Sequence, residues 1–568
     1  MLDMKNIKIF FFALGIIVTT SGCDKFLDPD QDNNLSEVQV LADPAMAEGI
    51  LLNAYSGLPS ALDFTDVATD NAVINIKDND LTKMATGEWK ATNYPLSVWP
   101  SAYKNIMYIN LFLSKVGQVQ WSWGSVWQNT EFAKKLTGEA YALRAFYEFQ
   151  LLEKHAGKSA DGTYLGFPIV ADYITSSDNV QNIKRNTYAE CFVRIKSDLD
   201  SAMKYLPVVY ADKVAGDPIK ADYDRVYGAR FTNRMNGQTA MFLKAKLLLH
   251  AASPAFSAAN AATYTDAANA AAALIKLSSV GGLNKLTATR NEYYLSTADP
   301  DVLWRRNQTN NTSVLEANNF PPSLYGTGQV NPSQNLVDAF PMKTGYPINY
   351  GSGSGFVPAT PFLNRDPRLA KYVLYNGTSF KSAIINTVSD PKDGFNKIPT
   401  STRTGYYLKK HLLSTVSLTP GAIAGQTHFY TLMRYTEAFL MYAEAANQAW
   451  GPDVDGGTNG FTARQVIAKI RSTAGITPDS YLALITTKDA MDALIRNERR
   501  IELSFEGSRF WDIRRWSDLS KMKEIAKGTN NGGLTSVDVE PRVYSDYMIY
   551  GPVPDTEVKK GLVQNIGW

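Results

Sequence analysis

Apolar residues recur at steps of three and four through much of this chain, the spacing that gathers them on one face of an α-helix. One such run consists of Leu136, Ala140, Leu143, Tyr147 and Leu151. It predicts a long helix with a single buried face.

A second run predicts both ends of its helix. Thr187 and Glu190 have the spacing of a capping box, which satisfies the free N–H groups at a helix start. Pro207 stops the helix, because proline lacks the backbone N–H that a helix interior needs. The apolar face between them consists of Tyr188, Phe192, Ile195, Leu199 and Met203.

The same periodicity predicts further helices over residues 44–58, 100–116, 238–252, 261–277, 432–450, 463–472 and 488–505. Many come as neighbouring pairs, as in helix-hairpin repeats of the tetratricopeptide kind. Residues 59–99 and 281–431 break the pattern and are rich in turn-forming residues, with a few short strands expected in the second. A long irregular region inside a compact protein tends to be functional. The predicted fold is therefore mainly α, with a helical-hairpin scaffold and a large loop-rich region.

The N-terminus has the pattern of a lipoprotein signal peptide over residues 1–22. Lys5 and Lys8 precede an apolar run of ten residues, too short to span a bilayer, and small residues then lead to Cys23. The alternative is an ordinary secretory signal with an incidental cysteine. We expect Cys23 to carry the lipid and the acidic stretch 23–40 to act as a tether. The other cysteine, Cys191, lies in an apolar helical pattern and is predicted to be a buried small residue.

Composition narrows the classes of function. The formal charge is only +2 over 568 residues, so the clustered positive charge that captures nucleic acid is not indicated, and an uncharged ligand is favoured. The four histidines lack metal-binding spacing, and no phosphate-binding, dinucleotide-binding or calcium-binding loop is found. We therefore predict no cofactor, no metal and no catalytic residues. Aromatic residues make up 11% of the chain, which suits stacking against sugar rings.

Several segments, taken in order, resemble the SusD/RagB family from end to end. They are CDKFLDPD after the cleavage site, GEAYALRAFYEFQLLEKHAG (138–157), NPSQNLVDAFPMKTGYPI (331–348), NRDPRL (364–369), TGYYLKKHL (404–412), RYTEAFLMYAEAANQ (434–448), RNERRIELSFEGSRFWDIRRW (496–516) and the closing VPDTEVKKGLVQNIGW. The resemblance implies a SusD-like helical repeat region over 41–280. It also implies a RagB/SusD region over 281–568, loop-rich to 431, helical over 432–516 and irregular in its tail.

The family resemblance also implies a function. Such proteins sit on the outer-membrane surface of Gram-negative bacteria, bind glycans and help deliver them to a TonB-dependent SusC-like transporter. Three alternatives stay open: a peptide cargo as in RagB-like relatives, a surface glycan hydrolase, and a purely structural adaptor for the transporter.

The longest matching segment also has a physical interpretation. Glu498, Glu502 and Glu506 are spaced to share one helix face, beside Arg499 and Arg509. Arginine pairs bidentately with carboxylates, so we expect a partly buried ionic lattice that locks this helix to the loops. A catalytic pair is disfavoured, because glycoside hydrolysis needs carboxyl groups on opposite sides of the bond.

Candidate ligand contacts come from the two irregular regions, as the resemblance implies. The first supplies Trp89, Asn93, Tyr94 and Trp99; the second supplies Tyr293, Tyr294, Trp304, Arg305, Arg306, Asn307 and Tyr325. Trp89 and Trp304 are favoured, although any of these aromatics could instead plug a loop against the helices. The segment WSWGSVW, with Trp121, Trp123 and Trp127, could be core packing, a second aromatic platform or a transporter contact; core packing is favoured.

Overall fold

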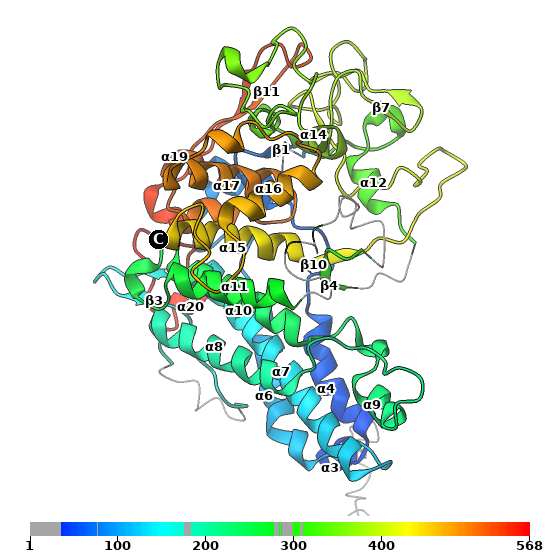
Figure 1. Ribbon diagram of the computed structural model, residues 1–568, viewed down its shortest axis with the longest axis vertical. Helices are drawn as coiled ribbons and strands as arrows, with labels where there is room; N and C mark the ends of the chain where they lie inside the picture. Colours follow the sequence, from blue (N-terminus) through cyan, green and yellow to red (C-terminus); the bar gives the residue numbers. More distant parts are fainter. Residues whose placement is uncertain are drawn as a thin grey trace, which may run out of the picture.

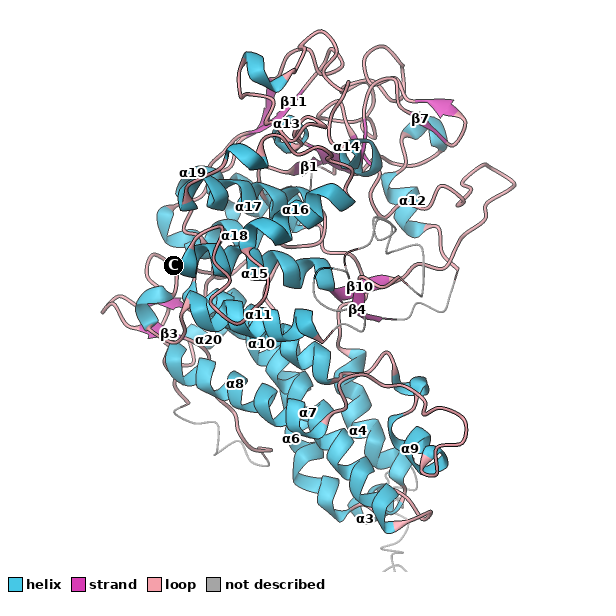
Figure 2. Ribbon diagram, in the orientation of Figure 1, coloured by secondary structure: helices cyan, strands magenta, loops and turns pink. Residues whose placement is uncertain are grey.

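The computed structural model describes residues 36–76, 78–174, 183–277, 283, 286, 299–306 and 311–568. Helices dominate one end of the molecule, and loops with short strands dominate the other (Figures 1 and 2). The mainly α fold predicted from the sequence is confirmed.

The scaffold is a succession of helices in which neighbours in the chain pack side by side. Its first part consists of α3 (Glu37–Ala42), α4 (Pro44–Ser56), α6 (Trp99–Lys115), α7 (Val126–His155), α8 (Tyr188–Tyr205), α9 (Lys220–Tyr227), α10 (Gly237–Ala252) and α11 (Tyr264–Lys276). Helix α11 then packs against α15 (Tyr435–Trp450), which contacts α16 (Ala463–Thr473) and α17 (Lys488–Glu502). The two halves of the sequence therefore share one stack of helices.

The predicted helix faces and caps are present. The five apolar residues from Leu136 to Leu151 are all buried on α7. At α8, the Thr187 hydroxyl accepts from the backbone N–H of Glu190, and the glutamate caps the N–H of Thr187 in return. Cys191 is buried as predicted, and burial raises the pKa of its thiol to about 12.

The predicted start of one helix is wrong. The helix expected from residue 432 begins at Tyr435, because Tyr430–Arg434 form strand β10. This strand pairs antiparallel with β4 (Val302–Arg306), bringing the loop-rich region against the scaffold. The cross-strand hydrogen bonds, which no local periodicity records, decide the conformation here.

The other helices and strands of the described residues are short. The helices among them are α5 (Asp80–Lys83), α12 (Val314–Asn319), α13 (Gln334–Ala339) and α14 (Pro367–Tyr372), and later in the chain come α18 (Arg509–Arg515), α19 (Leu519–Met522) and α20 (Asp555–Val558). Two-stranded antiparallel pairs join β1 (Ala72–Ile74) to β5 (Val330–Pro332), β2 (Gly157–Lys158) to β3 (Tyr164–Leu165), β6 (Val373–Leu374) to β9 (Tyr407–Leu408), β7 (Ser379–Phe380) to β8 (Ala383–Ile384), and β11 (Ala526–Gly528) to β12 (Val537–Glu540). The β1–β5 pair joins the two irregular regions of the sequence.

Candidate ligand-binding site

Trp89 is a core residue, which corrects the expectation that its ring faces a ligand. Its side chain is 2% exposed. The rings of Tyr94 and Trp568 lie 5.3 Å and 4.8 Å from it, and the Arg514 guanidinium lies 5.1 Å from its centre. The last residue of the chain and a helix near the C-terminus therefore cover the loop that was expected to bind.

Trp304 is buried as well, so the second favoured contact is also wrong. It lies on β4 opposite Met433 of β10. Its indole N–H donates to the backbone oxygen of Asn233 at 2.9 Å, and its ring meets Phe146 edge-on at 6.0 Å. Strand pairing fixes it between the scaffold and the loops, where it seals the junction.

The remaining candidates from the first irregular region do not form an open platform. Trp99 is buried against His155 at 5.1 Å, and the Tyr94 hydroxyl donates to the backbone oxygen of Lys154. Asn93 is exposed in a turn whose backbone bonds to Lys90. The alternative of loop aromatics packed on helices therefore holds for both rings.

The candidates from the second region divide into three groups. Tyr293, Tyr294 and Asn307 lie outside the described residues, as does Cys23. Arg305 and Arg306 are half-buried on β4, with the Arg305 guanidinium 5.2 Å from the Phe429 ring. Tyr325 is 57% exposed and follows the short helix η9 (Pro322–Leu324) in a left-handed conformation with φ of 64°. Among the aromatics predicted as ligand contacts that the structure describes, Tyr325 is the one that is exposed to solvent.

A hollow of about 460 Å³ lies beside the turn that follows this tyrosine, and we call it the loop pocket. Its lining residues are Asn75, Thr82, Asn396, Lys397, Ile398, Pro399, Ser401, Arg403 and Glu540. They come from the end of β1, from α5, from the loop after residue 393 and from β12. Both irregular regions of the sequence therefore meet at this pocket.

Two close contacts place the Tyr325 turn at the rim of the loop pocket. The Asn75 side-chain amide donates to the backbone oxygens of Thr327 and Gly328, both at 2.8 Å. Gly328 lies so close to Thr400 that a Cβ at this position would sit 2.7 Å from the Thr400 oxygen. Gly328 also has a φ of 52°, so glycine suits both its conformation and its spacing.

Arg403 organises the charged side of the loop pocket. Its guanidinium donates to the backbone oxygen of Ile74 at 2.8 Å and to the carboxylate of Glu540 at 2.7 Å. The other carboxylate oxygen of Glu540 accepts from Arg542 at 2.7 Å. Because both of its oxygens are held by arginine, Glu540 acts as an anchor for Arg403.

The loop pocket still offers hydrogen-bonding groups to a ligand. Within the described ranges, no residue donates to the Asn75 carbonyl oxygen, and the exposed Lys397 ammonium has no ion-pair partner. Ile398 and Pro399 add an exposed apolar surface. Donors, acceptors and an apolar surface suit a polyhydroxylated ligand, whose hydroxyls bond in-plane while its C–H faces meet apolar side chains.

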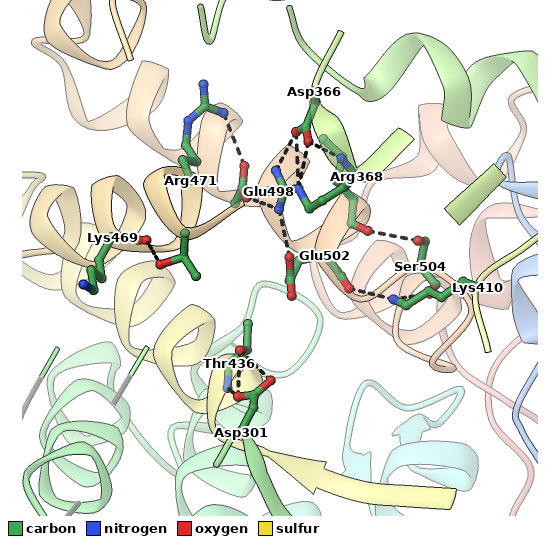
Figure 3. A network of polar contacts seen from close by, with 12 residues as sticks. Asp301, Asp366, Arg368, Lys410, Thr436, Lys469, Arg471, Glu498, Glu502 and Ser504 are labelled. Carbon is green, nitrogen blue, oxygen red and sulfur yellow. Dashed lines mark hydrogen bonds and ion pairs between the residues drawn. The ribbon is translucent and has the colours of Figure 1, made fainter. Parts of the chain in front are cut away.

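The ionic lattice predicted from the long motif is confirmed, with partners that the sequence did not reveal. Arg368 joins Glu498 at 2.5 Å and Glu502 at 2.8 Å, and it also holds Asp366 at 2.7 Å (Figure 3). Arg434 extends the lattice from Glu502 to Glu506. Glu506 does not share the helix face as expected, because α17 ends at Glu502.

The lattice carboxylates are unsuited to chemistry on a ligand. Glu498 and Glu502 are buried, and each accepts from two arginines. Burial alone raises the pKa of Glu506, but the charges of Arg434 and Lys410 outweigh it and lower the pKa to about 2. The three carboxylates are paired with basic side chains, as in structural ion pairs.

A second hollow, of about 550 Å³, lies between the scaffold and β10. Its lining includes Phe146 and Gln150 of α7, Lys246 of α10, Phe429 before β10 and Trp511 of α18. Lys246 forms an ion pair with Glu437 at 3.0 Å. This central cleft has none of the predicted site residues in its lining.

Sequence reasoning missed the residues that line the loop pocket. Asn75 follows a buried strand, and Arg403 precedes the matching segment TGYYLKKHL, but neither position carries a periodic or compositional signal. The available signal was their proximity to turn residues in the two irregular regions. Residue pairs more than 300 positions apart cannot be matched from a single sequence.

Comparison with known proteins identifies the chain's relatives. The model of the SusD family matches residues 296–568, and a model described as starch-binding proteins associating with the outer membrane matches residues 25–221. The chain belongs to the SusD/RagB family. The assignment that the sequence motifs suggested is confirmed.

Individual relatives agree over nearly the whole length. The SusD-like protein P38 of Formosa agariphila is 22% identical over 560 residues, which is 90% of this chain and 92% of that protein. A SusD-like protein of Bacteroides fragilis has a TM-score of 0.74 at 21% identity, covering 95% of this chain and all of that one. A SusD-like carbohydrate-binding protein of the same species has a TM-score of 0.70 at 19% identity, covering 92% and 99%. The solved structures show that the fold is shared.

Within the described ranges, no helix combines the length and hydropathy needed to cross a bilayer. In the same part of the chain, no three histidine, cysteine or acidic side chains gather closely enough to hold a metal ion.

Proposed function

We propose that this protein captures a neutral oligosaccharide at the loop pocket and performs no chemistry on it. The observation that carries the proposal is the loop pocket, where the Asn75 side-chain oxygen and the Lys397 ammonium have no partner among the described residues, and where the exposed Tyr325 precedes Gly328 at the rim by three residues. Membership of a family whose relatives include a carbohydrate-binding protein supports the same ligand class.

The lining of the loop pocket argues against hydrolysis. Glycoside hydrolysis uses two carboxyl groups that flank the bond. Among the described residues that line the pocket, Glu540 is the one carboxylate, and both of its oxygens accept from arginine. Binding without turnover is therefore the favoured activity.

The proposal also places the protein at the cell surface. Cys23 carries the lipid anchor, and the captured glycan passes to a TonB-dependent SusC-like transporter. The signal-peptide pattern before Cys23 and the matching outer-membrane family support this location. Isolation from native membranes in detergent is expected to yield a complex with a large β-barrel protein; a protein isolated alone under gentle conditions would contradict delivery.

Replacement of the exposed ring tests the binding site directly. The Tyr325→Ala substitution is made in a chain that starts at residue 24. It is expected to weaken the affinity of the protein for its polysaccharide about tenfold, which is equivalent to about 1.4 kcal/mol. Native affinity should lie in the micromolar to millimolar range, because ordering a flexible sugar offsets part of the stacking gain. Glycan and peptide arrays identify the ligand, and affinity electrophoresis measures the change.

Tyr350→Ala is the matched control, because Tyr350 is also an exposed tyrosine in the loop-rich region, but its ring packs against those of Tyr346 and Tyr481 at 5.0 Å and 5.4 Å. If the polysaccharide retains the Tyr325→Ala variant as strongly as the wild type, the proposed site is wrong. Binding of peptides alone would contradict the ligand class, and new reducing ends released from a polysaccharide would contradict the absence of catalysis.

A further inference from the structure

The connection between α6 and α7 and the first turn of α7 expose large apolar side chains that the proposed binding site does not use. Trp123 is 83% exposed, Val126 is 85% exposed and Trp127 is 41% exposed. The first tryptophan of the same segment, Trp121, is buried in the core. The favoured interpretation of core packing therefore holds for Trp121 and is wrong for Trp123 and Trp127.

The structure holds this connection in place. The Trp121 indole N–H donates to the backbone oxygen of Val116 at 2.9 Å, and its ring lies 5.9 Å from that of Phe112. The Asn129 side-chain oxygen accepts from the backbone N–H groups of Trp121 and Ser122. A rigid loop that presents tryptophan to solvent is prepared for contact with another surface.

Other exposed apolar residues border the same end of the scaffold. Val38 of α3 is 78% exposed, and Lys115 at the end of α6 forms an ion pair with the adjacent Glu37. Val214 and Ile219 are exposed just before α9, whose Asp222 accepts from Gln128 of α7 at 2.6 Å. We call Val38, Trp123, Val126, Trp127, Val214 and Ile219 the tryptophan end.

Charges at the tryptophan end compensate one another. The lysines there pair with carboxylates: Lys115 with Glu37, Lys134 with Glu131, Lys213 with Asp217 and Lys220 with Asp224. Contact with a partner at this end should therefore depend on apolar burial, with little attraction from charge.

The polar groups beside the tryptophans do not suit a sugar. Ser122 donates to the Gln128 carbonyl oxygen at 2.7 Å, and the Gln128 amide donates onward to Asp222. A sugar needs partners for its hydroxyls as well as a ring to stack on, and these groups already bond one another. An apolar partner fits better.

The tether expected at Cys23 indicates which apolar partner lies near. Described residues begin at Ser36, directly before α3 and thus at the tryptophan end (Figure 1). Thirteen peptide steps from Cys23 to Ser36 span at most about 45 Å. A lipid on Cys23 would therefore keep the tryptophan end close to the bilayer surface.

We propose that the tryptophan end rests on the lipid bilayer as a second membrane contact beside the lipid anchor. Tryptophan favours the membrane–water interface, where its ring meets lipid and its N–H meets water. Two weak attachments hold a protein far better than one. This inference rests on the proposed anchor at Cys23, and it would hold the loop pocket away from the membrane.

Flotation with neutral phosphatidylcholine vesicles tests the contact. The chain starting at residue 24, which lacks the lipid, is expected to float with the vesicles, and Trp123→Ala with Trp127→Ala is expected to lower binding about tenfold or more. Because the charges are compensated, added salt should change binding less than twofold. Tyr350→Ala, at the loop-rich end, is the aromatic control and should float like the wild type.

The following outcomes would contradict the proposed contact between the tryptophan end and the bilayer. A wild-type chain that stays in solution, or a double variant that floats equally well, rejects the bilayer. Loss of polysaccharide retention, or of a co-purifying β-barrel protein, in a double variant whose flotation is unchanged would assign the tryptophans to a glycan or to the transporter.

Glycan binding at the loop pocket and membrane contact at the tryptophan end can be tested independently. Tyr325→Ala should leave flotation unchanged while it reduces glycan retention. Lack of lipid labelling at Cys23 in the full-length protein would remove the anchor, whereas flotation of the lipid-free chain would still report on the tryptophans.

Discussion

The ionic lattice and the loop pocket are built from the same kinds of side chain but differ in how far those side chains are buried and paired. In the lattice, Arg368 is completely buried and meets three carboxylates. In the loop pocket, Arg403 is partly exposed and meets one carboxylate, Glu540. Paired, dehydrated charges lock segments together, whereas charges that keep water and spare hydrogen-bonding capacity remain available to a ligand.

The contrast extends to the aromatic residues. Trp89 and Trp304 lie in loops and strands near the expected site, yet both are enclosed by segments from elsewhere in the chain. Tyr325 stays open on a turn whose backbone is held by Asn75 and by contact with Thr400. The proposed binding site therefore consists of a few exposed side chains beside a closely packed interior.

The largest expected effect comes from breaking the lattice. Arg368→Ala leaves Asp366, Glu498 and Glu502 with too little positive charge around them, so the free energy of unfolding should fall by about 3–5 kcal/mol. Urea denaturation measures the loss. Glycan retention by the protein that remains folded should be unchanged; a change in stability below about 1 kcal/mol would show that the lattice is not locking the fold.

The next largest effect is expected on the pH dependence of the free energy of unfolding. Because the folded pKa of Glu506, about 2, lies below its ordinary value, its contribution to stability is present above about pH 4.5 and is lost as pH falls toward 2. The full contribution is about 3 kcal/mol. Glu506→Gln should therefore show a shallower loss of unfolding free energy between pH 5 and pH 2.

Asp66 titrates in the opposite direction and serves as an internal check. Burial raises its pKa to about 6, so this group destabilises the fold as pH rises from about 4 to 6. The comparison of wild type with Glu506→Gln cancels this contribution. Equal slopes in the two proteins would contradict the role of Arg434 and Lys410 in holding Glu506 charged.

The smallest effect on stability is expected at the loop pocket. Arg403→Ala removes a partly exposed ion pair, and Glu540 keeps Arg542, so the free energy of unfolding should change by less than about 1 kcal/mol. Glycan retention should nevertheless fall measurably in affinity electrophoresis. A loss of stability as large as that of Arg368→Ala would mean that the pocket belongs to the locked interior.

Local sequence signals were sufficient for much of the scaffold. The apolar faces of α7 and α8 and the capping box at Thr187 follow from residue spacing alone, because helix contacts repeat every three or four residues. The acidic spacing around Glu498 likewise indicated an ionic lattice. Its partner Arg368 lies 130 residues earlier and could not be matched without the fold.

The family and the mainly α architecture were thus determined by the sequence itself, through periodicity and the order of its motifs. Which aromatic rings are open was decided only by tertiary structure. Trp568 covers Trp89 from the far end of the chain, and pairing of β4 with β10 encloses Trp304. Exposure depends on what packs over a side chain, and for a residue in a loop that partner comes from segments that no local pattern identifies.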